Sequence, residues 1–339
     1  MPFKITIRSS SISFTAEQGE TILAAALRHG INLPYGCRNG SCGSCKGRVL
    51  EGETEYVHQH PEGITSEETR DGYALFCQAS PRTNIDIDTR VVNRLDDIPI
   101  RKLPCRVDKI DKLNHDVLRL FLRLPVTERL QFMAGQYIDI HMQNGQRRSF
   151  SLANAPHDDE FLELHVRYYN GGLFSEFAFH KLHEKSLLRI EGPLGSFFLR
   201  EDSDRPIILM AGGTGFAPVK SIIEHSVNKQ INRPIHLYWG ARTKSDLYMH
   251  ELACTWKKSI RDFQYEPVLS DPSASDEWHG KTGLVHEAVL HDFTDLSGYE
   301  VYACGPPPMV KAASDIFIKQ GLPASCFYSD SFEIAVPNS

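Results

Sequence analysis

The sequence predicts a multidomain protein with three successive folded parts, the last of them an α/β domain with a doubly wound parallel sheet. The length of 339 residues suits two or three domains at about 150 residues each. Two polar stretches interrupt the hydrophobic pattern, at residues 88–104 and at residues 201–206. The type of pattern also changes at each interruption. We therefore expect domains at residues 1–92, 102–200 and 204–339.

The first part combines strands, one helix and a long loop. Apolar and polar side chains alternate at Phe3, Ile5 and Ile7 and again at Ile12 and Phe14, which predicts two half-buried strands. A helical pattern follows at residues 21–29, TILAAALRH. After it comes a loop rich in glycine and cysteine.

The second and third parts differ in how their strands are separated. Residues 102–200 alternate strand-like runs with turns, as in DVLRLFLRL, GQYIDIHM, FLELHVRYY and SLLRIEG. This predicts an antiparallel barrel or sandwich, interrupted by one helix-like piece at residues 173–183. Residues 204–339 alternate strands with helices, beginning PIILMAGG, APVKSIIEHSVNK and PIHLYWGAR. That alternation is typical of a doubly wound parallel sheet.

Composition and charge exclude several classes of protein. Hydrophobic residues make up 41% and charged residues 24%, as in folded chains rather than disordered or fibrous ones. A net charge of −6 provides no strong basic field for nucleic acid or anionic lipid. The N-terminus lacks the apolar core of a signal peptide, and residues 207–211, the longest apolar run near the middle, are too few to span a membrane. We therefore expect a cytoplasmic protein with reduced thiols and no membrane span.

Four of the eight cysteines are spaced as metal ligands. Cys37, Cys42 and Cys45 follow the pattern C-x4-C-x2-C, and Cys77 comes after 31 further residues. This plant-type spacing supplies four thiolates to a [2Fe–2S] cluster. The loop also contains glycines that allow backbone N–H groups to approach the sulfides of such a cluster: Gly36, Gly40 and Gly43.

Three alternatives compete with the cluster. Zinc sites usually show two close cysteine pairs, whereas this loop has one pair and two single cysteines. A disulfide is disfavoured in the cytoplasm. A chance group of buried cysteines would leave the glycines unexplained. The remaining cysteines show no ligand spacing: Cys105, Cys254, Cys304 and Cys326.

Two motifs of the second part could hold a phosphate-bearing ring. In QRRSFS an arginine, an aromatic and a hydroxyl, at Arg148, Phe150 and Ser151, can share one face of a strand. Together they offer a phosphate partner, a stacking ring and a hydrogen-bond donor; the alternative is an ordinary strand with one buried Phe. Residues 171–175, GGLFS, form a glycine turn that opens a helix, where backbone N–H groups bind phosphate. An ordinary helix cap by Ser175 is the alternative.

The third part has a glycine loop between a strand and a helix, GGTGFAP at residues 212–218. Such a unit receives a pyrophosphate, although it is neither the G-x-G-x-x-G fingerprint nor a P-loop. The alternative is a bare turn. A later strand ends in CGPPPM at residues 304–309, and strand ends at this edge of a doubly wound sheet bind ligands.

The order of these motifs resembles the ferredoxin–NADP reductase superfamily with a plant-type ferredoxin domain at the N-terminus. The resemblance covers nearly the whole chain. It implies a β-grasp ferredoxin-like domain, an antiparallel FAD-binding barrel and an NAD(P)-binding domain. Reductase components of aromatic-ring and phenol oxygenases have this layout. Phrases such as AGQYIDI, GQRRSFSLANAP and LRIEGPLGSFFLRE resemble the reductases of 3,6-dideoxysugar synthesis.

The resemblance also implies roles for individual residues. In the flavin site, Arg148 would bind the pyrophosphate, Phe150 would stack on the isoalloxazine, and Ser151 would donate near N5. The other implied FAD contacts are Gly172 and Ser175 at the helix start, and His165 and Val166 on the strand beside the ring. For the nicotinamide coenzyme, the implied contacts are Gly212, Gly213, Thr214, Gly215, Cys304, Gly305 and Pro306. Cys304 would lie beside the carbon that carries the hydride, and Phe332 would cover the flavin. Ser151, Cys304 and Phe332 thus form the expected catalytic set.

The coenzyme preference depends on charge. Superfamily members that use NADPH place a Ser-Arg pair where this chain has Ser270-Asp271, and a carboxylate there would repel the 2′-phosphate. NADH is therefore expected, while Arg242 and Lys244 leave NADPH open.

The combined motifs imply an electron-transfer reductase. Electrons would pass from NADH to FAD, then to the [2Fe–2S] cluster, then to a partner protein. The expected partner is the pyridoxamine-phosphate-dependent dehydrase of dideoxysugar synthesis, and an aromatic-ring or phenol oxygenase is the alternative. A redox-sensing binding module is the alternative of another class. Residues 51–71, with seven carboxylates and one arginine, are a candidate docking face or a solvated loop.

Overall fold

The computed structural model describes residues 2–56, 59–92 and 98–332. The chain forms two compact units, residues 1–99 and residues 100–339. The division falls within the first predicted polar stretch, of which residues 93–97 lie outside the described residues. The end of that stretch is not a linker as expected, because the long strand β8 already begins at Arg101.

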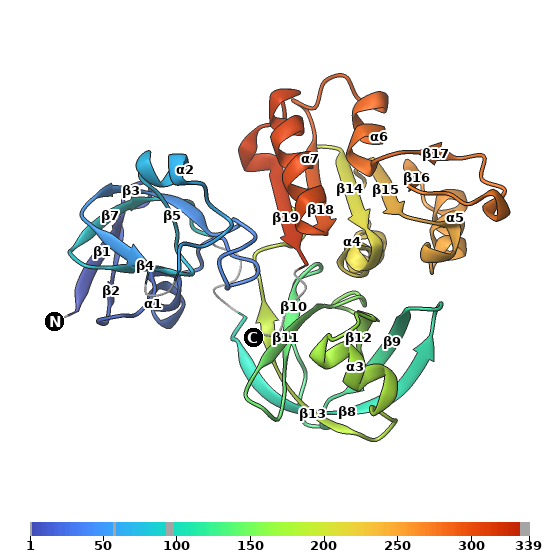
Figure 1. Ribbon diagram of the computed structural model, residues 1–339, viewed down its shortest axis with the longest axis horizontal. Helices are drawn as coiled ribbons and strands as arrows, with labels where there is room; N and C mark the ends of the chain where they lie inside the picture. The colour runs from blue at the N-terminus through green and yellow to red at the C-terminus, as the bar shows by residue number, and fades with distance from the viewer. Residues whose placement is uncertain (1, 57–58, 93–97, 333–339) are drawn as a thin grey trace. The chain divides into compact units, whose positions relative to one another are not determined.

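The first unit is a five-stranded mixed sheet with a helix packed on it (Figure 1, blue). The sheet order is β2-β1-β7-β3-β5, and a two-stranded sheet of β4 and β6 lies beside it. The strands are β1 (Phe3–Ile7), β2 (Ile12–Ala16), β3 (Lys46–Glu51), β4 (Thr54–Tyr56), β5 (Tyr73–Leu75), β6 (Ala79–Pro81) and β7 (Ile85–Asp88). The helices are α1 (Ile22–Arg28) and α2 (Ser66–Arg70).

The core of this unit is formed by the alternation that the sequence shows. Ile5 and Ile7 of β1 are fully buried and pair in parallel with Ile85 and Ile87 of β7. Helix α1 starts where Thr21 accepts a hydrogen bond from the N–H of Ala24, and it buries its apolar face in the same core. This confirms the predicted ferredoxin-like β-grasp domain.

The second unit begins with a six-stranded antiparallel barrel (Figure 1, cyan to green). Its order is β11-β10-β13-β8-β9-β12, and a bridge between Leu152 and Leu164 brings its two ends together. The strands are β8 (Arg101–Lys112), β9 (Val117–Arg123), β10 (Tyr137–His141), β11 (Arg147–Ser151), β12 (Leu162–Arg167) and β13 (Leu187–Leu194). Helix α3 (Leu173–His180) is the predicted helical interruption.

A parallel sheet forms the rest of the second unit (Figure 1, yellow to red). All six strands are parallel, in the order β17-β16-β15-β14-β18-β19. The strands are β14 (Ile207–Gly212), β15 (Ile235–Ala241), β16 (Phe263–Leu269), β17 (Lys281–Thr282), β18 (Glu300–Gly305) and β19 (Phe327–Ser331). The helices are α4 (Phe216–Asn228), α5 (His250–Ser259), α6 (Val285–Asp292) and α7 (Pro307–Lys319), and a 3-10 turn, η2 (Gly213–Gly215), precedes α4.

The strand order places both glycine motifs of this sheet together. β14 pairs with β15 on one side and with β18 on the other, so the order reverses between β14 and β18. The turn η2 follows β14, and Gly305 ends β18. Ligands of doubly wound folds bind at such a reversal, beyond the carboxyl ends of the strands.

The connection between barrel and parallel sheet is held by one buried arginine. Arg233 donates to the carbonyl oxygens of Arg205 (2.6 Å) and Arg200 (2.7 Å) and pairs with Glu300 at 2.6 Å. Tyr302 donates to the same Glu300 carboxylate. The predicted polar stretch at residues 201–206 is therefore fixed against the sheet, which helps to explain why the barrel and the sheet form one unit.

Among the described residues, no helix combines the length and the apolar character that crossing a bilayer requires.

Gly215 offers a test of the close packing between η2 and β18. A Cβ atom at this position would lie 2.1 Å from the carbonyl oxygen of Cys304, so the backbone of one segment would have to shift. Gly215→Ala should lower the thermal unfolding midpoint of the apo-protein by about 6–12 °C, because such overpacking costs about 3 kcal/mol. Gly298→Ala is the matched control, since nothing lies within 4 Å of its Cβ position. Equal midpoints for the two variants would contradict the prediction.

Candidate functional site

The structure brings the four spaced cysteines together in the first unit. Cys45 immediately precedes β3, and Cys77 lies in the turn between β5 and β6. Both are buried, and the N–H of Phe76 donates to the carbonyl oxygen of Cys45 at 3.1 Å, which joins the two segments. Cys37 and Cys42 are half-buried at the surface of the same loop.

Backbone N–H groups point at the sulfur atoms of this loop. The N–H of Cys37 donates to Cys42 Sγ and the N–H of Cys42 donates to Cys37 Sγ, each at 3.4 Å. The N–H of Ser44 donates to Cys42 Sγ at 3.5 Å. A hydrogen bond from the Cys42 thiol, with help from the N–H groups of Cys42 and Asn39 and from the Ser41 hydroxyl, lowers the pKa of Cys37 to about 5. Hydrogen bonds to neighbouring cysteines and burial raise the pKa of Cys42 and Cys45, so a bound metal would have to stabilise their thiolates. The N–H donors around the sulfur atoms fit a cluster of thiolate-bound iron.

Glycines leave room for this arrangement. A Cβ atom on Gly36 would lie 3.3 Å from Cys42 Sγ. Gly40 and Gly43 have φ values of +91° and +74°, which other residues rarely adopt. The predicted role of the glycines is thus consistent with the geometry. The other four cysteines are free thiols, and burial raises the pKa of Cys105 to about 12.

Strand β11 carries the arginine and the aromatic of the predicted flavin motif. Phe150 is half-buried, with its ring 4.8 Å from the ring of Phe174 on α3. Arg148 lies on the same face, and its guanidinium donates to the carbonyl oxygen of Arg147 at 2.7 Å. Burial lowers the pKa of Arg148, so its charge is not fully compensated by its neighbours. An anion bound beside Arg148 would stabilise its charged guanidinium.

Ser151 does not share the face of Arg148 and Phe150. The prediction that all three residues lie on one face is therefore wrong. Successive side chains of a strand point to opposite sides, and Ser151 follows Phe150 directly. Its hydroxyl instead donates to Asp330 Oδ2 at 3.0 Å. Asp330 lies on β19 of the parallel sheet, so this contact joins the barrel to the nicotinamide region.

The start of helix α3 presents a second fitting feature. Gly172 is its N-cap and supplies no side-chain cap to the first turn. The Ser175 hydroxyl is already engaged, because it donates to the carbonyl oxygens of Tyr169 (3.0 Å) and Gly172 (3.1 Å). An anion at this helix start would therefore meet backbone N–H groups, while Ser175 shapes the turn.

Two of the three predicted catalytic residues, Ser151 and Cys304, lie around one carboxylate. Asp330 Oδ2 accepts from Ser151, and the Cys304 thiol lies 3.9 Å from the same oxygen. The N–H of Phe332 donates to the carbonyl oxygen of Gly305 at 2.9 Å, which places Phe332 beside the CGPPPM turn. Asp330 was not predicted from the sequence, although its position near the carboxyl end of a strand was a usable signal.

The two glycine loops of the sheet touch backbone to backbone. A Cβ on Gly212 would meet Met309 Sδ at 2.6 Å, and one on Gly305 would lie 3.0 Å from the Cα of Gly212. These glycines permit the packing of one loop on the other. Gly213 is half-exposed with a φ of +54°, and its Cβ position lies 3.0 Å from Arg167 Nη1. Arg167 is a cation beside the loop that the sequence analysis also missed.

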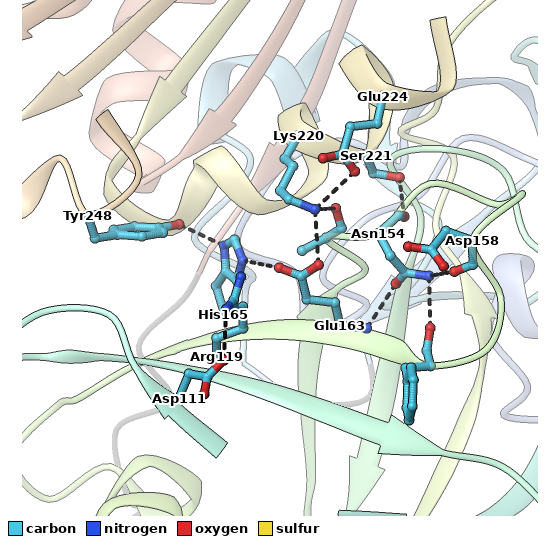
Figure 2. A network of polar contacts seen from close by, with 12 residues as sticks. Asp111, Arg119, Asn154, Asp158, Glu163, His165, Lys220, Ser221, Glu224 and Tyr248 are labelled. Carbon is cyan, nitrogen blue, oxygen red and sulfur yellow. Dashed lines mark hydrogen bonds and ion pairs between the residues drawn. The ribbon is translucent and has the colours of Figure 1, made fainter. Parts of the chain in front are cut away.

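The side chains of His165 and Val166 lie inside the protein. Val166 and the His165 side chain are 0% exposed. Figure 2 shows His165 between Glu163 and Tyr248, with Nε2 3.0 Å from Glu163 Oε1 and Nδ1 2.9 Å from the Tyr248 hydroxyl.

This buried network continues to the nucleotide helix. Lys220 on α4 pairs with Glu163 at 3.0 Å and with Glu224 at 3.0 Å (Figure 2). Burial alone would raise the pKa of Glu163, but His165 and Lys220 outweigh it and lower that pKa to about 2. Burial lowers the pKa of His165. A neutral His165 therefore donates from Nε2 to the Glu163 carboxylate and accepts at Nδ1 from Tyr248.

Comparisons with known proteins agree with this architecture. Residues 5–82 match the 2Fe-2S iron-sulfur cluster binding domain, residues 104–199 the oxidoreductase FAD-binding domain, and residues 209–315 the oxidoreductase NAD-binding domain. The chain is 42% identical to the CDP-6-deoxy-L-threo-D-glycero-4-hexulose-3-dehydrase reductase of Yersinia pestis, over 98% of this chain and 99% of the relative. It is 36% identical to reductase component 1 of terephthalate 1,2-dioxygenase from Comamonas sp, over 98% of each.

A solved structure supports the same assignment. The Amycolatopsis cytochrome P450 reductase GcoB aligns with a TM-score of 0.78 and 32% identity, over 97% of this chain and 98% of that one. The chain therefore belongs to the ferredoxin–NADP reductase superfamily, in the group whose members carry an N-terminal plant-type [2Fe–2S] ferredoxin domain. It is an electron-transfer reductase whose cofactors are a [2Fe–2S] cluster, FAD and NAD(H).

The cysteine loop makes a spectroscopic prediction. Cys45→Ala removes one cluster ligand, so the purified variant should lose the iron–sulfur absorption and fail to reduce one-electron protein acceptors. Flavin reduction by NADH should persist, because the flavin and nicotinamide motifs lie in the other unit. Cys105→Ala, at a buried cysteine without ligand spacing, should keep both activities. Loss of flavin reduction in Cys45→Ala would instead indicate that the cluster supports the whole fold.

Glu163 makes a prediction about acid stability. Its folded pKa is about 2 against an ordinary 4.5, so its contribution is complete above pH 4.5 and is lost as the pH falls toward 2. At neutral pH the free energy of unfolding should be about 3 kcal/mol higher for the parent than for Glu163→Gln. This difference should shrink as the pH falls from 4.5 to about 2. Urea unfolding at several pH values measures it. The exposed Glu184→Gln is the control, and a gain independent of pH would contradict the prediction.

Proposed function

We propose that the chain passes electrons from NADH through FAD and the [2Fe–2S] cluster to a dehydrase of 3,6-dideoxysugar synthesis, as a CDP-6-deoxy-3,4-glucoseen reductase does. One observation carries the hydride step: Asp330 meets both Ser151 from the flavin barrel and Cys304 from the nicotinamide loop. The dehydrase as acceptor is supported by the Yersinia pestis relative, whose name contains that partner.

The flavin contacts follow from the barrel. Arg148 would pair with the pyrophosphate, because its partly buried charge lacks full compensation. Phe150 would stack on the isoalloxazine from the barrel side. Gly172 would admit the phosphate to the start of α3, with Ser175 holding the turn. The burial of His165 and Val166 favours a role beneath the site rather than contact with the ring.

The nicotinamide contacts follow from the two glycine loops. Gly213 and Thr214 at the start of α4 would hold the pyrophosphate, with Gly212 and Gly215 allowing the loops to pack. Gly305 and Pro306 would border the nicotinamide, and Pro306 is exposed. Phe332 would cover the flavin face where the nicotinamide enters, and the hydrogen bond from its N–H to Gly305 supports a place beside the nicotinamide motif.

The protein's side chains position the reacting groups and hold protons on defined atoms. Asp330 accepts from Ser151 and so fixes the direction of that hydroxyl. Burial raises the pKa of Cys304 well above its usual value, so the thiol stays protonated and is no nucleophile. Bound FAD supplies the chemistry that accepts a hydride and releases electrons singly to the cluster.

We propose domains at residues 1–92, 102–200 and 204–339, and the residue ranges of the three main sheets support these boundaries. Within them, residues 51–71 are a weaker candidate for docking than the sequence suggested. Glu51 pairs with Arg8, Glu55 with Arg82, and Glu68 with Lys46. We expect the protein to act in the cytoplasm, where its thiols remain reduced.

Coenzyme choice is testable at the end of β16. Asp271 Oδ2 lies 3.6 Å from Arg242 Nη2, and both side chains are exposed. Asp271→Asn would remove the carboxylate and leave Arg242 to attract a 2′-phosphate. The ratio of kcat/KM for NADH over NADPH should fall about tenfold, as an electrostatic change of about 1.4 kcal/mol produces.

Asp262→Asn is the matched control for this substitution. Asp262 immediately precedes β16 and so lies at the opposite end of that strand from Asp271. Its variant should keep the coenzyme ratio of the parent. A parent that prefers NADPH, or an unchanged ratio in Asp271→Asn, would overturn the assignment of Asp271.

The acceptor is tested by reconstitution. The holoprotein should show flavin and iron–sulfur absorption that NADH bleaches, and it should reduce a purified pyridoxamine-phosphate-dependent dehydrase faster than a dioxygenase oxygenase component. The 36% identical terephthalate dioxygenase reductase component favours the oxygenase as the second candidate, and faster transfer to that protein would select it. Transfer to cytochrome c without transfer to either protein would exclude both acceptors but keep the reductase. Failure to oxidise NADH with any acceptor would favour a redox-sensing module.

A further inference from the structure

Helix α4, which follows the glycine loop GGTGFAP, is hydrogen-bonded to the flavin barrel at one buried place. α4 begins at Phe216, directly after η2, and Lys220 and Ser221 lie in its second turn. Lys220 Nζ donates to the carbonyl oxygen of Ala153 at 3.2 Å, and Ser221 Oγ donates to that of Asn154 at 2.7 Å. Figure 2 shows these contacts reaching from the helix to the barrel.

The barrel segment that α4 contacts follows the flavin motif directly. Ala153 and Asn154 stand two and three residues after Ser151. The Asn154 amide donates to the carbonyl oxygens of Asp158 (2.6 Å) and Phe161 (2.9 Å), and its oxygen accepts from the N–H of Glu163 at 2.9 Å. Three hydrogen bonds of Asn154 thus brace the turn that follows the end of β11.

A second set of contacts leads from the Glu163 carboxylate back to the glycine loop GGTGFAP. Glu163 binds Lys220 with one oxygen and His165 with the other, and His165 binds Tyr248. The Tyr248 ring packs edge-on against Trp239 at 5.2 Å, and Trp239 Nε1 donates to the carbonyl oxygen of Gly213 at 3.0 Å. The chain of contacts thus begins and ends beside η2.

None of these side chains is placed to touch a substrate. Lys220 is 7% exposed, Ser221 is 0% exposed and the His165 side chain is 0% exposed. Buried ion pairs add little net stability compared with apolar residues of the same shape. Their directional hydrogen bonds do fix one register between the two surfaces, which an apolar contact would fix less sharply.

We propose that Lys220, Ser221 and Glu163, here called the clasp, are positioning residues for hydride transfer. The barrel places the flavin end of the reaction through Ser151, and η2 places the nicotinamide end. The clasp ties the turn after Ser151 to the helix after η2, so it sets the separation of donor and acceptor. Errors of about 1 Å in such a separation cost about 100-fold in rate.

The test measures hydride transfer apart from binding. Lys220→Met keeps the length of the side chain and removes its charge, and Ser221→Ala removes one hydroxyl with little change in volume. In anaerobic stopped-flow with the FAD-loaded protein, the limiting rate of flavin reduction by NADH should fall about 10- to 100-fold in Lys220→Met and less in Ser221→Ala. The Kd for NADH should stay within about twofold. With C4-deuterated NADH, the isotope effect should become more temperature-dependent than in the parent.

A readout without turnover accompanies the kinetics. Amide hydrogen exchange of residues 152–161 should accelerate in both variants, because the turn loses its anchor on α4. Lys229→Met, at the exposed C-terminal end of the same helix, should match the parent in every measurement. Limiting rates per bound flavin equal to the parent's in both variants, or a loss explained wholly by lower FAD content, would overturn the proposal. Faster exchange with an unchanged isotope effect would also overturn it, by showing a purely structural contact.

Discussion

One constraint governs the second unit: the ends of two strands from different sheets must meet at a single point. The hydroxyl of Ser151 comes from an antiparallel barrel, and Cys304 comes from a parallel sheet. Asp330 accepts a hydrogen bond from the first and lies within 3.9 Å of the second. A hydride moves only between closely placed partners, so everything that holds the barrel against the sheet also sets the chemistry.

Two buried ion pairs hold these parts together at separate places. Arg233 and Glu300 fix the connecting segment, and Lys220 and Glu163 fix the turn after Ser151 to α4. A buried pair costs desolvation that its Coulomb attraction only roughly offsets. Such pairs therefore contribute more to one defined arrangement than to stability. The presence of a second, directional branch through His165 and Tyr248 agrees with that reading.

Local patterns predicted the elements well. The alternation around Ile5 and Ile7 predicted a buried strand, and the helix at residues 21–29 was found as α1 (Ile22–Arg28). The motifs GGTGFAP and CGPPPM lie at adjacent strand ends, as strand order at a switch point requires. The prediction that Arg148, Phe150 and Ser151 share a face was wrong, because adjacent residues of a strand point to opposite sides.

The sequence by itself determined the cofactor chemistry, since ligand spacing and loop glycines are local features that a few consecutive residues specify. It also determined the order of the domains. Only the tertiary structure decided which side chains face one another across the two sheets. Asp330 lies 179 residues from Ser151, and Lys220 lies 57 residues from Glu163. No periodicity records such pairs, because they depend on how separately formed sheets pack. The structure likewise places the buried His165 side chain between Glu163 and Tyr248, which its place on a strand could not reveal.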